Sequence, residues 1–230
     1  MHRTRIKICG LTRADDVAAA VTAGADALGF VFYPQSRRWI APSAAAGLIA
    51  GVPPFVTTVG LFVNASSQEI ADAVAQAPVM LLQFHGDETP EQCAALAAGV
   101  NRPFIAACRV GPLTTAANLL EYEARCRAAG KLFAGLLLDT HVAGYGGGGK
   151  VFDWSVIPEE LAPRVVLSGG LHAQNATEAV IRVRPHAVDV SSGIEAAPAD
   201  GKAPTPGIKN AALMQAFVAA VRAGDDTRLQ

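Results

Sequence analysis

Residues 5–12 read Arg5-Ile6-Lys7-Ile8-Cys9-Gly10-Leu11-Thr12, and this short stretch decides between two fold classes. The run up to Cys9 is mostly apolar and has strand length, and an alanine-rich segment of helical period follows from Arg13. A strand that leads directly into a helix indicates an α/β protein. A doubly wound sheet usually carries a GxGxxG fingerprint in this first turn, and CGLT has none. The turn therefore favours a barrel, with the doubly wound sheet as the alternative.

The rest of the chain repeats the strand-then-helix unit. The expected strands are Arg5–Cys9, Ala27–Phe32, Val56–Val63, Val79–Phe84, Phe104–Cys108, Phe133–Asp139, Val165–Ser168 and Ala187–Val190. The expected helices are Arg13–Ala23, Pro42–Gly51, Ser67–Gln76, Thr89–Ala98, Leu113–Ala129, Ala173–Val183 and Ile208–Ala223. Continuous apolar runs are typical of buried parallel strands. Eight strands alternating strictly with about eight helices predict one (β/α)8-barrel domain over residues 1–230, with a frayed polar tail over 224–230.

Signals at the helix ends agree with this division. Thr12 with Asp15 resembles a capping box, Pro42 suits the first turn of a helix, and Ser66 or Ser67 can cap the third helix. Glycines at positions 24, 51, 99 and 130 each follow an apolar helical run, as helix C-caps do.

The composition excludes several classes of protein. Of the residues, 51% are hydrophobic and 17% charged, which is enough apolar material for a large core and too little charge for a disordered chain. The formal net charge of −1 lacks the basic excess of a nucleic-acid-binding protein. The sequence has neither a signal-peptide core nor an apolar run of about 18 residues, so we expect a cytoplasmic protein that does not enter membranes. The four cysteines lack metal-binding spacing.

Two glycine-containing turns follow the seventh and eighth expected strands. They read Ser168-Gly169-Gly170 and Ser191-Ser192-Gly193. Glycine lets backbone N–H groups approach an anion, and barrels frequently bind phosphate between these two loops. Tight turns rich in Gly and Ser are the alternative for either loop alone. Their occurrence together favours a phosphate site.

Asp139 and Cys9 are the candidates for proton transfer. Asp139 ends the expected strand after Leu136-Leu137-Leu138, where partial desolvation suits a general acid, although it could instead cap a turn or pair with Lys150. The segment from Thr140 to Lys150 is rich in glycine and suggests a lid. Cys9 could act as a general base beside a cation, although a lone cysteine at a strand end is more often inert.

Arg38 and His85 also follow expected strands. The loop Tyr33-Pro34-Gln35-Ser36-Arg37-Arg38 brings a guanidinium near the mouth, and its planar fork suits a carboxylate. His85 fits the lining of a site and a satisfied core histidine equally well.

Eight segments in order resemble phosphoribosylanthranilate isomerases. They are Lys7–Thr12 (KICGLT), Gly24–Arg38 (GADALGFVFYPQSRR), Gly60–Asn64 (GLFVN), Leu82–Glu88 (LQFHGDE), Leu137–Thr140 (LLDT), Gly149–Trp154 (GKVFDW), Leu167–Leu171 (LSGGL) and Val188–Glu195 (VDVSSGIE). Any one of them is a weak match, but eight across nearly the whole chain, mostly at strand exits, are specific.

The resemblance implies a TIM barrel of the ribulose-phosphate-binding type and an aldose–ketose isomerase of tryptophan biosynthesis. Its reaction is the Amadori rearrangement of N-(5-phosphoribosyl)anthranilate to 1-(2-carboxyphenylamino)-1-deoxyribulose 5-phosphate. By this resemblance Asp139 is the general acid and Cys9 the general base, while Arg38 holds the anthranilate carboxylate. The implied substrate-binding residues also include His85, Gly169, Gly170, Ser192 and Gly193. The family needs no metal or other cofactor, and we expect a monomer or a homodimer with a small phosphoribosyl substrate as ligand.

Two departures and two alternatives remain. Gly148 stands where the family usually has Ser or Thr, and residues 196–206 form a long stretch rich in Pro and Ala. Another barrel acting on phosphoribosyl substrates, such as the isomerase of histidine biosynthesis, typically has an aspartate in place of Cys9 and half-barrel repetition, which is not evident here. A catalytically inactive barrel that serves as a scaffold would not need both Cys9 and Asp139.

Overall fold

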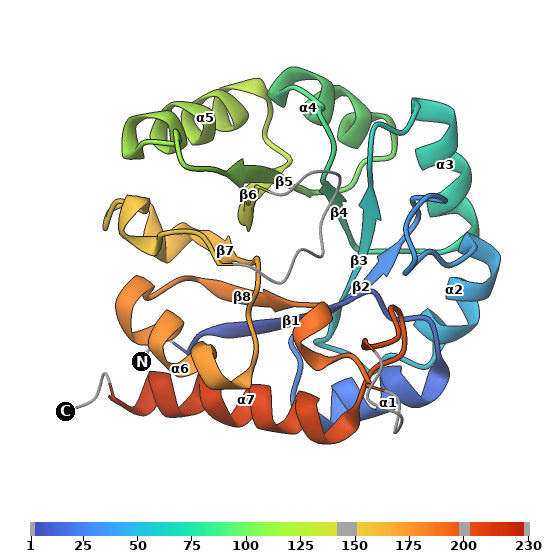
Figure 1. The fold of residues 1–230 in the computed structure, drawn as a ribbon. Coiled ribbons are helices and arrows are strands. Elements are labelled where there is room, and N and C mark those ends of the chain that lie inside the picture. Colours follow the sequence, from blue (N-terminus) through green and yellow to red (C-terminus); the bar gives the residue numbers. More distant parts are fainter. Residues whose placement is uncertain (1–2, 142–150, 198–202, 228–230) are drawn as a thin grey trace.

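The computed structural model describes residues 3–141, 151–197 and 203–227. Its eight parallel strands form a closed barrel in chain order, with β8 paired back to β1. The strands are β1 (Arg5–Cys9), β2 (Ala27–Val31), β3 (Thr57–Phe62), β4 (Leu81–Phe84), β5 (Phe104–Val110), β6 (Phe133–Thr140), β7 (Val165–Leu167) and β8 (Ala187–Val190). Figure 1 shows the strands at the centre with the helices around them. The predicted (β/α)8 barrel is confirmed.

The described residues hold seven α-helices, one fewer than the strict alternation predicts. They are α1 (Ala14–Ala23), α2 (Pro42–Ala50), α3 (Ser67–Gln76), α4 (Pro90–Gly99), α5 (Ala116–Ala129), α6 (Ala173–Val183) and α7 (Ala211–Asp226). In the described part of the β6–β7 connection, the short 3-10 helices η1 (Trp154–Val156) and η2 (Ala162–Arg164) occur in place of an α-helix. Pro158 and Pro163 lie in this segment, and proline in a helix interior removes a hydrogen bond and clashes with the preceding turn.

The helix ends correct some sequence predictions and confirm others. The predicted capping box of Thr12 is wrong, because the N-cap of α1 is Arg13, without a side-chain cap, and the Thr12 hydroxyl donates to the Gly207 carbonyl at 2.7 Å. Ser66 does cap α3, in a capping box with Glu69. Gly24 ends α1 with a φ of 94°, a left-handed conformation that glycine adopts without strain.

Two further helix boundaries differ from the prediction. Helix α5 begins at Ala116 instead of Leu113, whose side chain is fully in solvent. Gly99 is the last residue of α4, and Val100 caps that helix.

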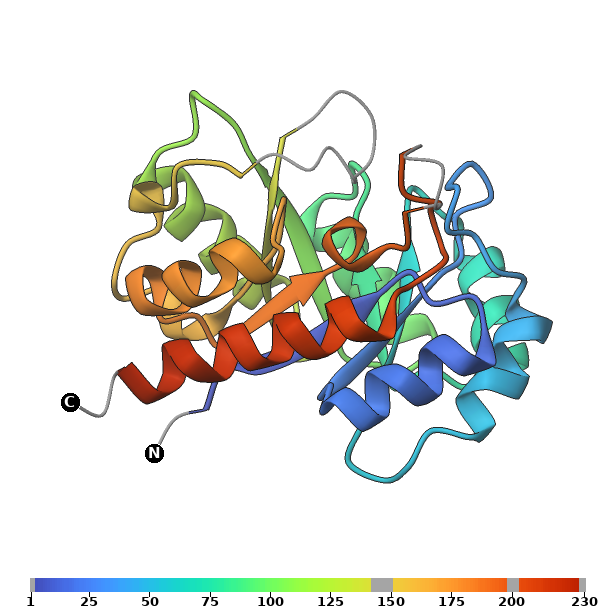
Figure 2. The same ribbon diagram turned by 60° about the horizontal axis from the view of Figure 1, so that its bottom comes forward.

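Helix α7 lies across α6 and α1 and is the longest helix described (Figure 2). It continues through Asp226, three residues beyond the predicted end at Ala223, and residues 228–230 lie outside the described residues. Gly224 is buried because α6 approaches so closely that a Cβ there would lie 2.8 Å from Val180 Cβ. The Thr4 hydroxyl donates to Asp225 at 2.7 Å and ties this helix to the start of β1.

The core surrounds the strands and joins them to the helices. Side chains such as Leu28, Phe104 and Leu138 on the strands and Val180 and Phe217 on the helices are fully buried. None of the helices in the described ranges is long and apolar enough to span a membrane. This packing fixes the carboxyl ends of all eight strands at one mouth, where barrel enzymes place their active sites.

Candidate active site

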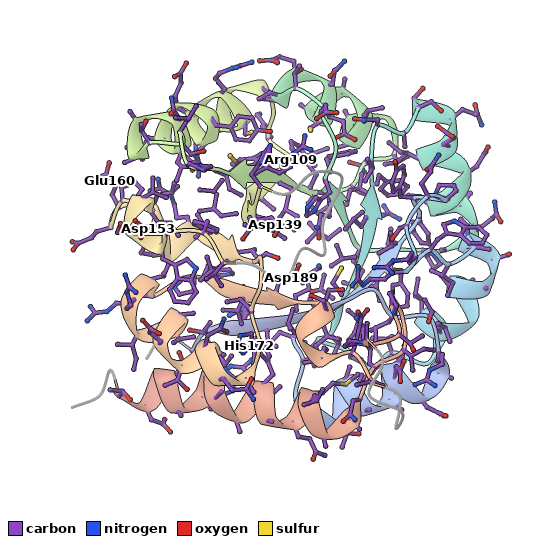
Figure 3. All side chains as sticks on the ribbon, in the orientation of Figure 1. Arg109, Asp139, Asp153, Glu160, His172 and Asp189 are labelled. Carbon is purple, nitrogen blue, oxygen red and sulfur yellow. The ribbon has the colours of Figure 1, made fainter. Side chains whose placement is uncertain are left out.

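The side chains predicted to be functional follow different strands but share this mouth. Cys9 ends β1, Asp139 is the penultimate residue of β6, and His85 directly follows β4. Arg38 lies in the loop after β2, and the two glycine-containing turns follow β7 and β8. In Figure 3, Asp139 and Asp189 lie toward the centre of the barrel, whereas Asp153 and Glu160 lie at its rim.

Cys9 is buried beside an ion pair. Lys7 lies two residues earlier on β1 and therefore faces the same side of the strand. Its ammonium group contacts Asp189 of β8 at 2.8 Å, and both side chains are buried. Burial raises the pKa of the Cys9 thiol, and Lys7 opposes this rise only in part. Gly29 of β2 leaves room for the sulfur, since a Cβ there would lie 2.7 Å from Cys9 Sγ.

Asp139 is held by hydrogen bonds on both carboxylate oxygens. The backbone N–H of Thr140 donates to Oδ1 at 2.8 Å, and Nε2 of His85 lies 3.0 Å from Oδ2. The amide nitrogen of Gln83 lies 2.9 Å from Nδ1 of the same imidazole. Gly169 makes the approach of β7 possible, because a Cβ there would overlap Thr140 and lie 2.8 Å from Asp139 Oδ1. His85 is thus connected to the candidate acid.

Arg38 is fixed by a buried carboxylate. Its Nε and Nη2 donate to Glu195 at 2.7 and 2.9 Å, a bidentate pair. Lys209, with a fully buried side chain, contacts Glu195 at 3.2 Å and donates to the Ser191 carbonyl at 2.9 Å. Burial alone would raise the pKa of Glu195, but Arg38, Lys209 and the Gly207 N–H outweigh it, so this pKa is lowered. Glu195 therefore stays ionised and sets the orientation of the Arg38 guanidinium.

The turns after β7 and β8 touch one another. Gly169 and Gly170 have φ values of 86° and 65°, which favour glycine. A Cβ on Gly193 would overlap the Leu171 carbonyl, so the second turn lies directly against the first. The N–H groups of Gly169, Gly170, Ser192 and Gly193 donate no hydrogen bond to the part of the chain that the structure describes. The structure brings the two predicted phosphate loops together, with backbone donors available.

Several sequence predictions lie outside the described residues. Residues 142–150, which include Gly148 and Lys150 of the predicted lid, are among them, as are residues 198–202 of the stretch after the eighth strand. Within the described ranges, no three His, Cys, Asp or Glu side chains are placed to share a metal ion.

Sequence reasoning assigned no role to four charged residues of this mouth: Lys7, Asp189, Glu195 and Lys209. Each lies buried beside a candidate residue or its partner. A signal was present for two of them, because Lys7 and Asp189 interrupt apolar strands and a charge buried in a strand requires a partner. Glu195 and Lys209 form a β-bridge in an otherwise irregular segment, which no local pattern predicts.

The comparisons with known proteins agree with this geometry. Residues 6–220 match the family model described as N-(5'phosphoribosyl)anthranilate (PRA) isomerase. The N-(5'-phosphoribosyl)anthranilate isomerase of Herminiimonas arsenicoxydans is 65% identical over 225 residues, covering 98% of this chain and 96% of that protein. A crystal structure of phosphoribosyl anthranilate isomerase from Thermotoga maritima superposes with a TM-score of 0.80 at 38% identity, covering 95% of this chain and 98% of that one.

Two further solved structures give information on a ligand and on an assembly. Each is 34% identical to this chain and covers 95% of this chain and 98% of the other. One is a phosphoribosyl anthranilate isomerase in complex with reduced 1-(o-carboxyphenylamino)-1-deoxyribulose 5-phosphate, with a TM-score of 0.73. The other concerns monomers generated from the dimeric enzyme of Thermotoga maritima, with a TM-score of 0.75. The family model matches most of the chain, a named relative is 65% identical, and the solved relatives share the barrel. This chain therefore belongs to the N-(5'-phosphoribosyl)anthranilate isomerase family.

Proposed function

We propose that this protein catalyses the Amadori rearrangement of N-(5'-phosphoribosyl)anthranilate to 1-(2-carboxyphenylamino)-1-deoxyribulose 5-phosphate, a step of tryptophan biosynthesis. The observation that carries the proposal is the arrangement of the mouth. A buried thiol on β1 and a buried carboxyl on β6 flank a group of backbone donors after β7 and β8. This combination supplies a base, an acid and an anion site around one mouth of the barrel, as family membership would require.

Asp139 protonates the furanose ring oxygen in this proposal, and the bond from that oxygen to C1 breaks to give an open-chain iminium ion. Cys9 then removes the proton from C2 as a thiolate, for which the Lys7 ammonium offsets part of the cost of burial, and the C–H electron pair forms the C1=C2 bond of the enolamine. Ketonisation of the enolamine gives the product. Both groups are nearly excluded from water, at 4% exposure for Cys9 and 8% for Asp139, which strengthens electrostatic interactions between them and a substrate.

The anionic ends of the substrate have separate binding groups. The backbone N–H groups of Gly169, Gly170, Ser192 and Gly193 hold the phosphate, because aligned amide dipoles attract an anion without a side-chain cation. Arg38 holds the anthranilate carboxylate through the guanidinium nitrogen, Nη1, that is not paired with Glu195. The bidentate pair with Glu195 supports this role because it prepares the guanidinium plane before the substrate arrives.

The test follows anthranilate fluorescence while the purified protein consumes freshly prepared phosphoribosylanthranilate. Cys9→Ala and Asp139→Asn should each lower kcat by about 10²- to 10⁴-fold. Cys93→Ala, at a buried cysteine of α4, and Asp153→Asn, at the rim, are the matched controls and should keep wild-type rates. Absence of turnover by folded wild-type protein, or full activity of either site variant, would contradict the proposal.

We also propose that the protein is a homodimer, because the related enzyme of Thermotoga maritima is described as dimeric. Phe55 is fully exposed, with a φ of 71°, beside a cavity of about 500 Å³ at the opposite mouth of the barrel. An exposed aromatic side chain next to a cavity suits reciprocal packing between two copies. Light scattering on Phe55→Asp should then give the monomer mass. Leu113→Asp, at another highly exposed side chain, in the β5–α5 loop, should leave the mass unchanged, and a monomeric wild type refutes this assembly.

A further inference from the structure

Gln83, His85 and Asp139 form one continuous buried chain of hydrogen bonds beneath the mouth. Gln83 is 0% exposed, His85 7% and Asp139 8%. Gln83 and His85 are two residues apart at the end of β4 and so face the same side, while Asp139 comes from β6. The His85 backbone N–H donates to the Phe62 carbonyl of β3 at 2.9 Å and fixes the main chain from which the ring projects. Both ring nitrogens therefore have partners within the protein.

The position of the acid proton follows from these contacts. A general acid must hold a proton when its substrate binds. Oδ1 of Asp139 accepts a hydrogen bond from the Thr140 N–H, so the proton belongs on Oδ2. Oδ2 lies 3.0 Å from Nε2 of His85. Among the described residues, His85 is the titratable side chain that is in hydrogen-bond contact with Asp139. The proton delivered to substrate is thus located between these two atoms.

The amide of Gln83 decides whether His85 can share that proton. With the amide nitrogen toward Nδ1, the ring accepts there and keeps its one proton on Nε2, and Gln83 Oε1 is left buried without a partner. Turned by 180°, the amide places Oε1 as an acceptor for Nδ1–H, and Nε2 becomes free to exchange a proton with Oδ2. The second arrangement gives the buried Oε1, which has no partner in the first, a hydrogen bond from Nδ1–H. The requirement for a protonated acid favours the second.

We propose that His85 stores the proton that Asp139 delivers, with Gln83 as the acceptor that keeps Nδ1 protonated. This inference rests on the proposed acid role of Asp139. The pair holds one proton as imidazolium with carboxylate or as imidazole with carboxylic acid, and both forms have the same total charge. When Oδ2–H transfers its proton to the ring oxygen, neutral imidazole and carboxylate remain, and solvent restores the proton after product release. His85 acts through Asp139 and is a positioning residue in this scheme.

The surrounding charges are largely compensated. Arg109 of β5 pairs with Asp87 and contacts the carbonyl of Gly86, the residue after His85, at 3.3 Å. Glu88 accepts from the Gly86 N–H at 2.9 Å, and the β3 side presents the uncharged Asn64. Lys7 and Asp189 on β1 and β8 neutralise each other. The proton content of the His85–Asp139 pair is therefore the main variable charge at this wall of the mouth.

The test uses His85→Gln, whose amide can still donate to Asp139 but cannot carry a transferable proton. We expect kcat to fall at least 100-fold with KM within about threefold, and the alkaline limb of the kcat profile to move to lower pH. Gln83→Glu, which keeps an acceptor for Nδ1–H, should move that limb to higher pH, and Gln83→Leu should move it to lower pH. His186→Gln, at an exposed histidine of the opposite mouth, is the matched control. A kcat near the wild-type value in His85→Gln would overturn the proposal, because it would show that His85 serves only as a hydrogen-bond donor.

A second readout does not depend on turnover. In ¹⁵N-histidine-labelled wild-type protein at neutral pH, the proposal expects Nδ1 of His85 to carry a proton, and the resonance is assigned by its loss in His85→Gln. An unprotonated Nδ1 would overturn the proposal even if the enzyme is active. Wild-type protein that fails to consume phosphoribosylanthranilate but shows a protonated Nδ1 would instead locate the failure in the proposed function.

Discussion

Replacing Gly29 by alanine moves the candidate base without touching any group that binds the substrate. Gly29 lies opposite Cys9 in the β1–β2 register, and an added Cβ would lie 2.7 Å from Cys9 Sγ. Ordinary van der Waals contact begins at 3.4 Å, so the sulfur must move by about 0.7 Å. The same Cβ would lie 3.1 Å from the Cys9 Cα, so rotation of the side chain alone does not relieve the overlap.

The expected costs follow from this displacement. Overpacking of a well-packed core typically destabilises a protein by about 1–3 kcal/mol. A misplacement of about 1 Å in a reacting group can lower turnover about 100-fold. We therefore expect Gly29→Ala to fold and to lose about 1–3 kcal/mol of unfolding free energy, as other overpacked cores do. We expect its kcat to fall about 100-fold with KM nearly unchanged.

The assay combines urea unfolding with anthranilate fluorescence kinetics. Gly47→Ala in α2 is the control, since no atom lies within 4 Å of its added Cβ and alanine favours a helix by up to about 1 kcal/mol. Gly29→Ala should also cost less stability in a Cys9→Ala background, because the sulfur is absent there, although contacts with the Cys9 backbone persist. Wild-type kcat in a destabilised Gly29→Ala would refute the reasoning, since it would show that turnover tolerates a displaced Cys9.

Three other perturbations test the remaining parts of the site. Glu195→Gln should raise KM about tenfold with little change in kcat, because the Arg38 guanidinium loses its ionic partner; steady-state kinetics measure this, and an unchanged KM would contradict it. The pKa of Glu195 is lowered by Arg38 and Lys209, so its contribution to stability is present at neutral pH and is lost as the pH falls. The difference in unfolding free energy between wild type and Glu195→Gln should therefore begin to shrink below about pH 4.5, and a difference independent of pH would refute the pairing. Gly169→Ala should lower both stability and kcat, because its Cβ would overlap Thr140 and crowd Asp139; unfolding and kinetics on the same sample check both, and a fully active variant would argue against the close approach of β7.

The strands were the most predictable part of the fold. The strands are mostly apolar, as burial on both faces of a parallel sheet requires, and Arg5–Cys9 and Ala187–Val190 match the structure at both ends although Lys7 and Asp189 interrupt them. The connection after β6 was not predictable from alternation, because Pro158 and Pro163 break the helical pattern and two short 3-10 helices result. The end of α7 was missed because a glycine followed by polar residues reads as a helix stop, whereas Gly224 here allows α6 to pack closely.

The candidate site was predictable where it depends on one position at a strand end. Cys9, Asp139 and the turns after β7 and β8 could be found because parallel strands bring their carboxyl ends to one mouth. The partners of these residues could not, because they are set by three-dimensional proximity. Lys7 and Asp189 are 182 positions apart, and Arg38 and Glu195 are 157 apart. A sequence pattern can indicate that a charge such as Lys7 or Asp189 is buried, but it does not show which residue that charge pairs with.

The charges of the mouth explain how a chain with a net charge of −1 can bind an anionic substrate. The mouth holds three cations and two carboxylates, since Lys7 pairs with Asp189 while Arg38 and Lys209 share Glu195, and one positive charge is left over beside Arg38. A phosphate carries about −1.5 to −2 charges at neutral pH, so a dense group of lysines would bind it strongly but would also lower the proton affinity of nearby acids. In the proposed site, backbone dipoles after β7 and β8 attract the phosphate without adding a full positive charge beside Asp139. We infer that this division allows one mouth to bind an anion tightly and still keep an acid protonated.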